Sequence, residues 1–165
     1  MNKSKFSHDI IPCKIHSDGR KYPYEITENM WYKWDGVEGK IQPTIIVVPK
    51  GYFTDLVSSP WVVQWAVKPN GIAAMPAIYH DVGCSTEYAN VRYVNNIMNA
   101  AMIDWGIRAG LRLPIYYGIY TFCWLTYKKH IKKEVKEDRE LVLKATEEVW
   151  KEYGKLFNGY AKMKF

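Results

Sequence analysis

A histidine and an aspartate stand next to each other at His80 and Asp81, in a segment (residues 75–83) whose pattern predicts a helix. Histidine is the side chain best matched to proton transfer near neutral pH, and a neighbouring carboxylate can orient a base or bind a cation. Successive residues on a helix point about 100° apart, so we expect the two side chains not to pair directly. One could instead act as general base while the other binds a cation.

Further polar residues could join this pair at one site. Asp55 follows a β-branched run, and Asn95 falls on the next predicted helix. Carboxylates at Asp55 and Asp81 would suit Ca²⁺ or Mg²⁺, whereas the His80 imidazole would suit a transition metal such as Zn²⁺. Asp81 and Asp55 are therefore candidate metal ligands, and with His80 they are the candidate catalytic residues of an enzyme. The candidate supporting residues are Thr54, Ser58 and Asn95.

The same residues also have a purely structural interpretation. Asp55, Ser58 and Ser59 stand just before a predicted helix start, where side-chain oxygens cap free backbone N–H groups. His80 could be a buried histidine bonded to Asp55 or to a backbone carbonyl. The motif would then join a loop to a helix and perform no chemistry. The residues alone leave both interpretations open.

The first sixty residues favour short strands and turns. Residues 24–27, 30–34 and 44–48 carry β-prone side chains, and Pro49 ends the last run. The pair Asp35-Gly36 marks a turn between the second and third runs. These patterns predict a small antiparallel sheet.

Helical patterns follow the predicted sheet. Ser59-Pro60 predicts a helix start, and further helices are predicted over residues 75–83 and about 90–107. The run at residues 115–127 predicts a buried helix, and an amphipathic helix starts near Ile131. Its apolar stripe, which could fold back on the domain or dock on a partner, consists of Val135, Val142, Ala145, Val149, Tyr153, Leu156 and Tyr160. The predicted fold is α+β: a small N-terminal antiparallel sheet followed by a four- or five-helix, aromatic-rich part.

Composition excludes several classes of protein. The chain has 165 residues, with 48% apolar and 24% charged residues, as in an ordinary globular domain. No apolar run is long enough to span a bilayer, and the N-terminus lacks the apolar segment of a secretory signal. Three cysteines, an odd number, cannot form a complete disulfide framework, so we expect a reducing compartment.

The net charge of +6 is concentrated in the last third of the sequence. Residues 111–165 carry 12 lysines and arginines against 7 acidic residues. Such a basic region could attract nucleic acid, an anionic membrane surface or an acidic partner. The interspersed acidic residues favour a solvated helix face.

Two motifs lie on either side of the predicted start of the helical part. The first is GYFTDLVSSP at residues 51–60, and the second is AIYHD at residues 77–81. Together they resemble the phage and prophage family called domain of unknown function 1353, over about residues 22–125. The matching residues are Val48, Pro49, Gly51, Thr54, Asp55, Ser58, Pro60, His80 and Asp81.

The chain departs from the family's pattern at three positions. Val57 replaces a small alanine, Cys84 stands where the family has tyrosine, and Asn95 stands where it has aspartate. The change at Asn95 removes a carboxylate from the candidate polar cluster, which weakens a metal or acid–base role.

The resemblance implies a virus-encoded or prophage-encoded protein, without implying an activity. We expect one α+β domain over residues 1–130 and a C-terminal amphipathic helical extension over residues 131–165. We also expect synthesis in the host cytoplasm without a signal peptide, followed by incorporation into the virion if the protein is a particle component.

Three functions follow as hypotheses. The leading one is a non-catalytic binding or assembly protein, such as a virion or tail component, that contacts a phage or host protein through its aromatic surface or C-terminal helix. The alternative is a small hydrolase of a cell-envelope substrate, with His80 as general base and Asp81 and Asp55 as ligands of Ca²⁺, Mg²⁺ or, less readily, Zn²⁺, or as orienting groups. The third is an inhibitor of a host nucleic-acid or defence enzyme, acting through the basic last third. Convergence of the three side chains at an open pocket would favour the hydrolase.

Overall fold

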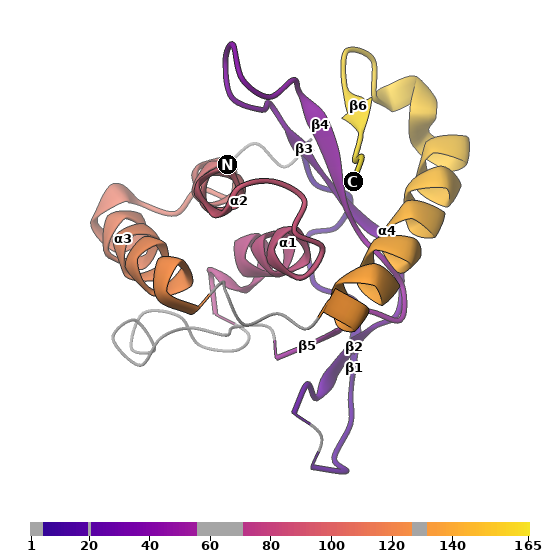
Figure 1. Cartoon of the computed structure of the whole chain (residues 1–165), viewed down its shortest axis with the longest axis horizontal. Coiled ribbons are helices and arrows are strands. Elements are labelled where there is room, and N and C mark those ends of the chain that lie inside the picture. The colour runs from indigo at the N-terminus through magenta and orange to yellow at the C-terminus, as the bar shows by residue number, and fades with distance from the viewer. Residues whose placement is uncertain (1–4, 20, 56–70, 127–131) are drawn as a thin grey trace.

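The computed structural model describes the backbone of residues 5–19, 21–55, 71–126 and 132–165, and the side chains of these ranges except 122–126 and 132–134 (Figure 1). The strands in these ranges are β1 (Cys13–Ile15), β2 (Tyr24–Ile26), β3 (Met30–Trp34), β4 (Thr44–Val48), β5 (Phe53–Thr54) and β6 (Ala161–Lys162). The helices are α1 (Ala74–Ser85), α2 (Val91–Asp104), α3 (Ala109–Thr126) and α4 (Lys132–Tyr153). The predicted α+β class is confirmed.

The strands form two small sheets. One sheet has the antiparallel order β1-β2-β5, and the other has the order β3-β4-β6. The predicted strands at residues 24–27, 30–34 and 44–48 are confirmed as β2, β3 and β4, and β3 pairs with β4 as an antiparallel hairpin. Strand β6 comes from the far end of the chain and pairs with β4 in parallel.

Strand β4 is the centre of the fold, because both of its faces are covered. All five of its residues are buried. Ile46 and Val48 point into the core that includes α1, whereas Ile45 and Val47 pack in a second cluster with residues of α4. The alternation of side chains along a strand explains why a continuous β-branched run, rather than an alternating one, forms this element.

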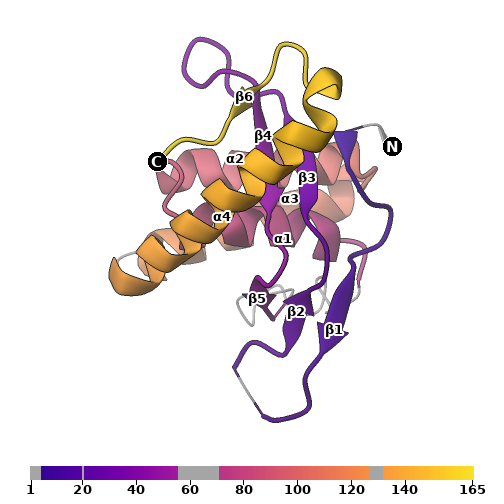
Figure 2. The same cartoon turned by 90° about the vertical axis from the view of Figure 1, so that its right-hand side faces the viewer.

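The helices are stacked in layers on this sheet (Figures 1 and 2). Helix α4 lies across one face, so the apolar stripe of the C-terminal segment folds back on the rest of the chain. Helix α1 covers the other face, α2 packs on α1, and α3 packs on α2. Helix α1, which carries His80 and Asp81, is thus held between a sheet and another helix.

The core is rich in aromatic rings, as predicted. Phe6 stacks on Tyr32 at 4.7 Å between ring centroids, and Trp105 meets Phe6 edge-on at 5.0 Å. Tyr32 donates a hydrogen bond of 2.8 Å from its hydroxyl to Asp104, so its one polar atom is satisfied inside the core. These contacts tie the N-terminal residues to β3 and α2.

The segment predicted as a buried helix at residues 115–127 differs from the structure in two ways. Helix α3 begins at Ala109 and contains Pro114. The backbone N–H groups of Leu111 and Arg112 donate to the carbonyl of Arg108, so the helix has already started before the proline. The prediction of burial was wrong, since Tyr117 is 61% exposed whereas Ile115 is buried. Among the described elements helix α3 is the outermost layer, and it packs mainly against α2.

The apolar stripe predicted for the C-terminal helix holds along α4 but fails after it. Val142, Ala145 and Val149 are buried. Leu156 is 58% exposed, because the helix ends at Tyr153 and a tighter helical turn changes the direction of the chain, which buries Phe157 instead. The helix predicted to start at Ser59-Pro60 lies outside the described residues. Each described helix is too short or too polar to cross a bilayer.

Glycine at position 83 lets α1 and α2 approach each other closely. A Cβ atom placed on Gly83 would lie 2.9 Å from Cγ1 of Val94, a buried β-branched side chain that has little freedom to move. The same approach brings His80 of α1 within hydrogen-bonding distance of Asn95 of α2.

We therefore expect Gly83→Ala to lower the free energy of unfolding by about 1–3 kcal/mol, because the added methyl group forces the two helices apart. Gly110→Ala is the matched control: it also lies in a helix, no atom is within 4 Å of an added Cβ, and its free energy of unfolding should be unchanged or slightly higher. Urea unfolding measures both. Equal stability of the two variants would contradict the close contact.

Candidate functional site

The candidate residues are brought together from three elements. Thr54 ends β5, His80 and Asp81 lie in the middle of α1, and Asn95 lies in the first half of α2. Helix α1 is fixed on β4 by the buried side chains described above, and α2 is fixed on α1 by the contact at Gly83. The geometry of the site therefore depends on the packing of α1.

His80 and Asn95 form the innermost part of the site. The Nε2 atom of His80 lies 2.9 Å from Oδ1 of Asn95, and the two residues are only 6% and 1% exposed. Because an amide oxygen accepts, the imidazole donates from Nε2 in this bond. Burial of the histidine, which the structural interpretation predicted, is confirmed, with an α2 side chain as its partner.

Asp81 links the histidine to the sheet. Its Oδ2 atom accepts a hydrogen bond of 3.1 Å from the Thr54 hydroxyl, and its Oδ1 atom lies 3.8 Å from Nδ1 of His80. The prediction that these neighbours would not pair was wrong: the side chains reach ion-pair distance, although 3.8 Å is too long for a hydrogen bond. The flexible ends of the two side chains close the angle between their Cα–Cβ bonds.

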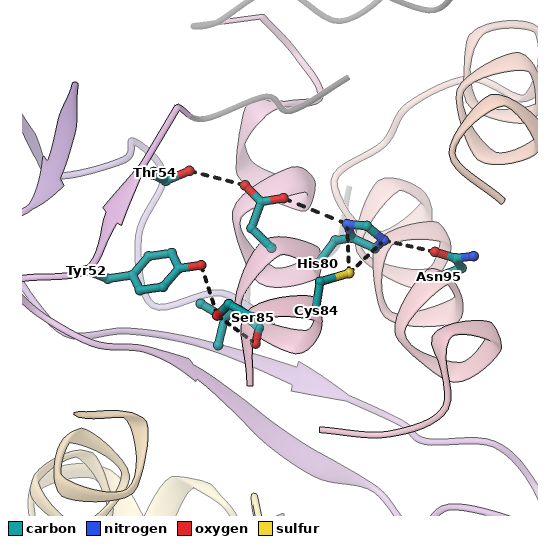
Figure 3. Close-up of polar contacts among 8 residues, drawn as sticks. Tyr52, Thr54, His80, Cys84, Ser85 and Asn95 are labelled. Carbon is teal, nitrogen blue, oxygen red and sulfur yellow. Dashed lines mark hydrogen bonds and ion pairs between the residues drawn. The ribbon is translucent and has the colours of Figure 1, made fainter. Parts of the chain in front are cut away.

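These contacts make one polar chain across the fold, from Thr54 through Asp81 and His80 to Asn95 (Figure 3). It joins β5 to α1 and α1 to α2. Three of its residues are buried, and the Asp81 side chain keeps 19% of its surface exposed. Buried polar groups stabilise a fold only when they have partners, and here the side chains serve as partners for one another. The polar chain therefore specifies how β5, α1 and α2 dock.

Cys84, one of the three positions that depart from the family's pattern, contacts His80. Its Sγ atom lies 3.8 Å from Nδ1 and 3.6 Å from Nε2 of His80. The two ring nitrogens are bonded to the same ring carbon. A sulfur atom in the ring plane at nearly equal distances from both nitrogens would therefore lie too close to that carbon. The thiol must lie over the face of the ring (Figure 3). A cysteine nucleophile instead needs to meet a nitrogen lone pair in the ring plane.

The spacing of Cys84 and His80 by four residues on a helix is the signal that could have identified this contact. No comparable signal points to Tyr52, which lies before β5 and donates a hydrogen bond of 3.2 Å from its hydroxyl to Ser85 at the end of α1. Burial, and then the negative charge of Asp81, raise the pKa of Tyr52 well above its ordinary value. Tyr52 is thus a neutral hydrogen-bond donor beside the polar chain.

Two candidate residues remain to be placed. Asp55 is half-buried directly after β5, one residue beyond Thr54, and Ser58 lies outside the described residues. Among the described residues, which include Asp55, His80, Asp81 and Cys84, no three histidine, cysteine or acidic side chains are gathered closely enough to hold a metal ion. The arrangement that the described side chains do show is a polar chain of two hydrogen bonds and one ion-pair contact between elements.

The bond between His80 and Asn95 can be tested by removing its acceptor. We expect Asn95→Leu to lower the free energy of unfolding by about 1–3 kcal/mol, because it leaves a buried N–H group without a partner. Asn96→Leu, the same change at a half-buried position of α2, should lower it by less than about 0.5 kcal/mol, since water can solvate the half-buried Tyr116 hydroxyl that donates to Asn96. Chemical denaturation of both variants measures the difference, and a harmless Asn95→Leu would show that the bond does not form.

The buried tyrosines predict a loss of stability at alkaline pH. The pKa values of Tyr52 and Tyr79 are raised, mainly by burial, so the folded protein keeps protons that the unfolded chain releases near pH 10. Stability that is complete below about pH 10 is therefore lost as the pH rises further. We expect urea unfolding at a series of pH values to show that the free energy of unfolding falls less steeply above pH 10 in Tyr52→Phe than in the wild type. The exposed Tyr117→Phe is the control and should behave like the wild type. An identical slope in Tyr52→Phe would contradict this assignment.

Comparison with protein families gives a match. The family model described as Protein of unknown function (DUF1353) matches residues 25–119, which include β2 to β5, α1, α2 and the start of α3. No curated protein and no solved structure gives a significant match. The matched range is more than half of the 165 residues and contains every described residue of the polar chain. The chain therefore belongs to the DUF1353 family of proteins of unknown function.

Proposed function

We propose that this protein is a phage-encoded or prophage-encoded, non-catalytic binding or assembly protein, and that it acts as a virion or tail-associated component. One observation carries the proposal: the histidine of the motif is buried and bonded to Asn95. A general base must reach a proton on the substrate. The Nε2 atom of His80 is instead occupied by a contact inside the protein.

The residue at position 95 supports the same conclusion. In the family's pattern this position holds an aspartate, whose charge would favour a protonated imidazole and could bind a cation. The amide of Asn95 accepts the same hydrogen bond without a charge, which is sufficient to join α1 to α2. The Thr54–Asp81 bond has the same kind of role between β5 and α1. Both contacts are those expected of a folding motif.

The surface supports a binding role. Large apolar side chains are exposed on α3 and around the β1–β2 hairpin, and such side chains mark sites of protein contact where they gather on a surface. The exposed residues of these two regions are Ile10, Ile15, Tyr22, Phe53, Leu113 and Tyr117. The viral origin is supported by the resemblance of the two motifs to those of phage and prophage proteins.

A second function, hydrolysis of a cell-envelope substrate, is favoured by one specific contact. The second ring nitrogen of His80, Nδ1, is not used in the bond to Asn95 and lies 3.8 Å from the partly exposed carboxylate of Asp81. In this alternative His80 is the general base, and Asp81 and Asp55 orient it or bind a divalent cation.

Asp81→Asn separates the two functions, because it removes the charge but keeps an oxygen that can accept from Thr54. For an assembly protein, we expect the wild type and the variant to be present in equal amounts in purified particles and to give equal phage yields. Quantitative mass spectrometry of gradient-purified particles and plaque titres measure this.

A wild-type protein found only as a free monomer, outside the particles, would contradict the virion role. A turnover of lipid or peptidoglycan that disappears in Asp81→Asn would establish the hydrolase instead. Urea unfolding of the variant confirms that it remains folded.

A further inference from the structure

A pocket of about 430 Å³ lies beside the β3-β4-β6 sheet, away from the polar chain of His80. Its walls come from segments far apart in the sequence: the loop between β3 and β4, the start of β4, the loop between α1 and α2, and β6 with the residues after it. Figure 2 shows the β3–β4 loop and β6 next to each other at one end of the molecule. The polar and charged residues of the wall are Lys40, Gln42, Thr44, Tyr88, Lys162 and Lys164.

The pocket is positively charged. Lys162 is neutralised, since its ammonium group contacts both carboxylate oxygens of Glu147 at 2.6 and 2.8 Å. Lys40 and Lys164 are exposed, and within the described part of the chain neither ammonium group has a carboxylate partner. Two uncompensated charges therefore face one open pocket, which creates a local attraction for anions.

Thr44 and Tyr88 form the floor of the pocket, and among the described lining residues both of their hydroxyl groups already donate within the protein. The Tyr88 hydroxyl donates to Thr44 at 3.3 Å, and the Thr44 hydroxyl donates to the backbone carbonyl of Gln42 at 2.9 Å. The Tyr88 ring is held edge-on between Trp34 and Phe165. An anion in this pocket would thus be held by flexible lysine ammonium groups above a rigid aromatic floor, without the converging donors that enclose a small metabolite.

We infer that the pocket docks an acidic segment of a partner protein, with a glutamate or aspartate side chain inserted between Lys40 and Lys164. This inference rests on the proposed binding function and specifies the chemistry of the partner. An open pocket with two free lysines suits a carboxylate that is presented by another surface. A nucleic acid requires a longer row of positive charges along its phosphates, and here one of the three lysines of the wall, Lys162, is already paired with Glu147.

The experiment uses the full chain, labelled with ¹⁵N, and a hexaglutamate peptide as probe at low ionic strength. We expect the amide signals of Thr44, Tyr88 and Lys162 to shift during the titration, and binding to weaken as salt is added. The double variant Lys40→Glu/Lys164→Glu should bind the peptide at least about tenfold more weakly. Lys14→Glu is the matched control, because this exposed lysine lies in β1 at the opposite end of the molecule and should bind like the wild type.

Every other result overturns the inference. Shifts spread over all lysines, and reduced equally by Lys14→Glu, would show general attraction of a polyanion. Binding of inorganic phosphate or an oligothymidylate in the pocket, without binding of the peptide, would assign it to a phosphate ligand. Absence of peptide binding in a protein that still enters particles would refute the pocket's role alone, whereas peptide binding by a protein absent from particles would refute the virion role alone.

Discussion

The burial of β4 on both faces is the constraint on which the rest of the structure depends. A strand of five buried residues between two helices removes several large aliphatic side chains from water, and each contributes about 1.5–3 kcal/mol. One covering helix, α1, carries the motif residues, and the other, α4, comes from the end of the chain. The position of His80 is thus set by apolar packing around Ile46 and Val48, and its polar contacts refine that position.

The polar chain then decides how precisely the layers dock. A buried hydrogen bond contributes only about 1 kcal/mol, but an unmade one costs more, so a shifted packing of α1 would be penalised at His80 and at Thr54. Asn95 fits this role as well as an aspartate would, and it avoids a buried negative charge. The motif can therefore be retained for docking whether or not it performs chemistry.

Much of the fold could be predicted from local patterns, and the failures have physical causes. The β-branched run of β4 and the apolar residues three and four positions apart in α2 are strong local signals, and both elements formed close to their predicted bounds. The exposure of Tyr117 depends on what covers α3, which no spacing reveals. The site was found in part: Asn95 was grouped with His80 from the family's pattern, but its role as the direct acceptor requires the close approach at Gly83.

The parallel pairing of β6 with β4 has a consequence for the order in which the chain folds. During synthesis, the β3–β4 hairpin leaves the ribosome more than a hundred residues before its neighbour Lys162. Until then one edge of β4 and the face that α4 will cover are open, so the nascent hairpin is a surface that other strands can join. Contacts between such distant residues also slow folding, which makes completion of this sheet a late event.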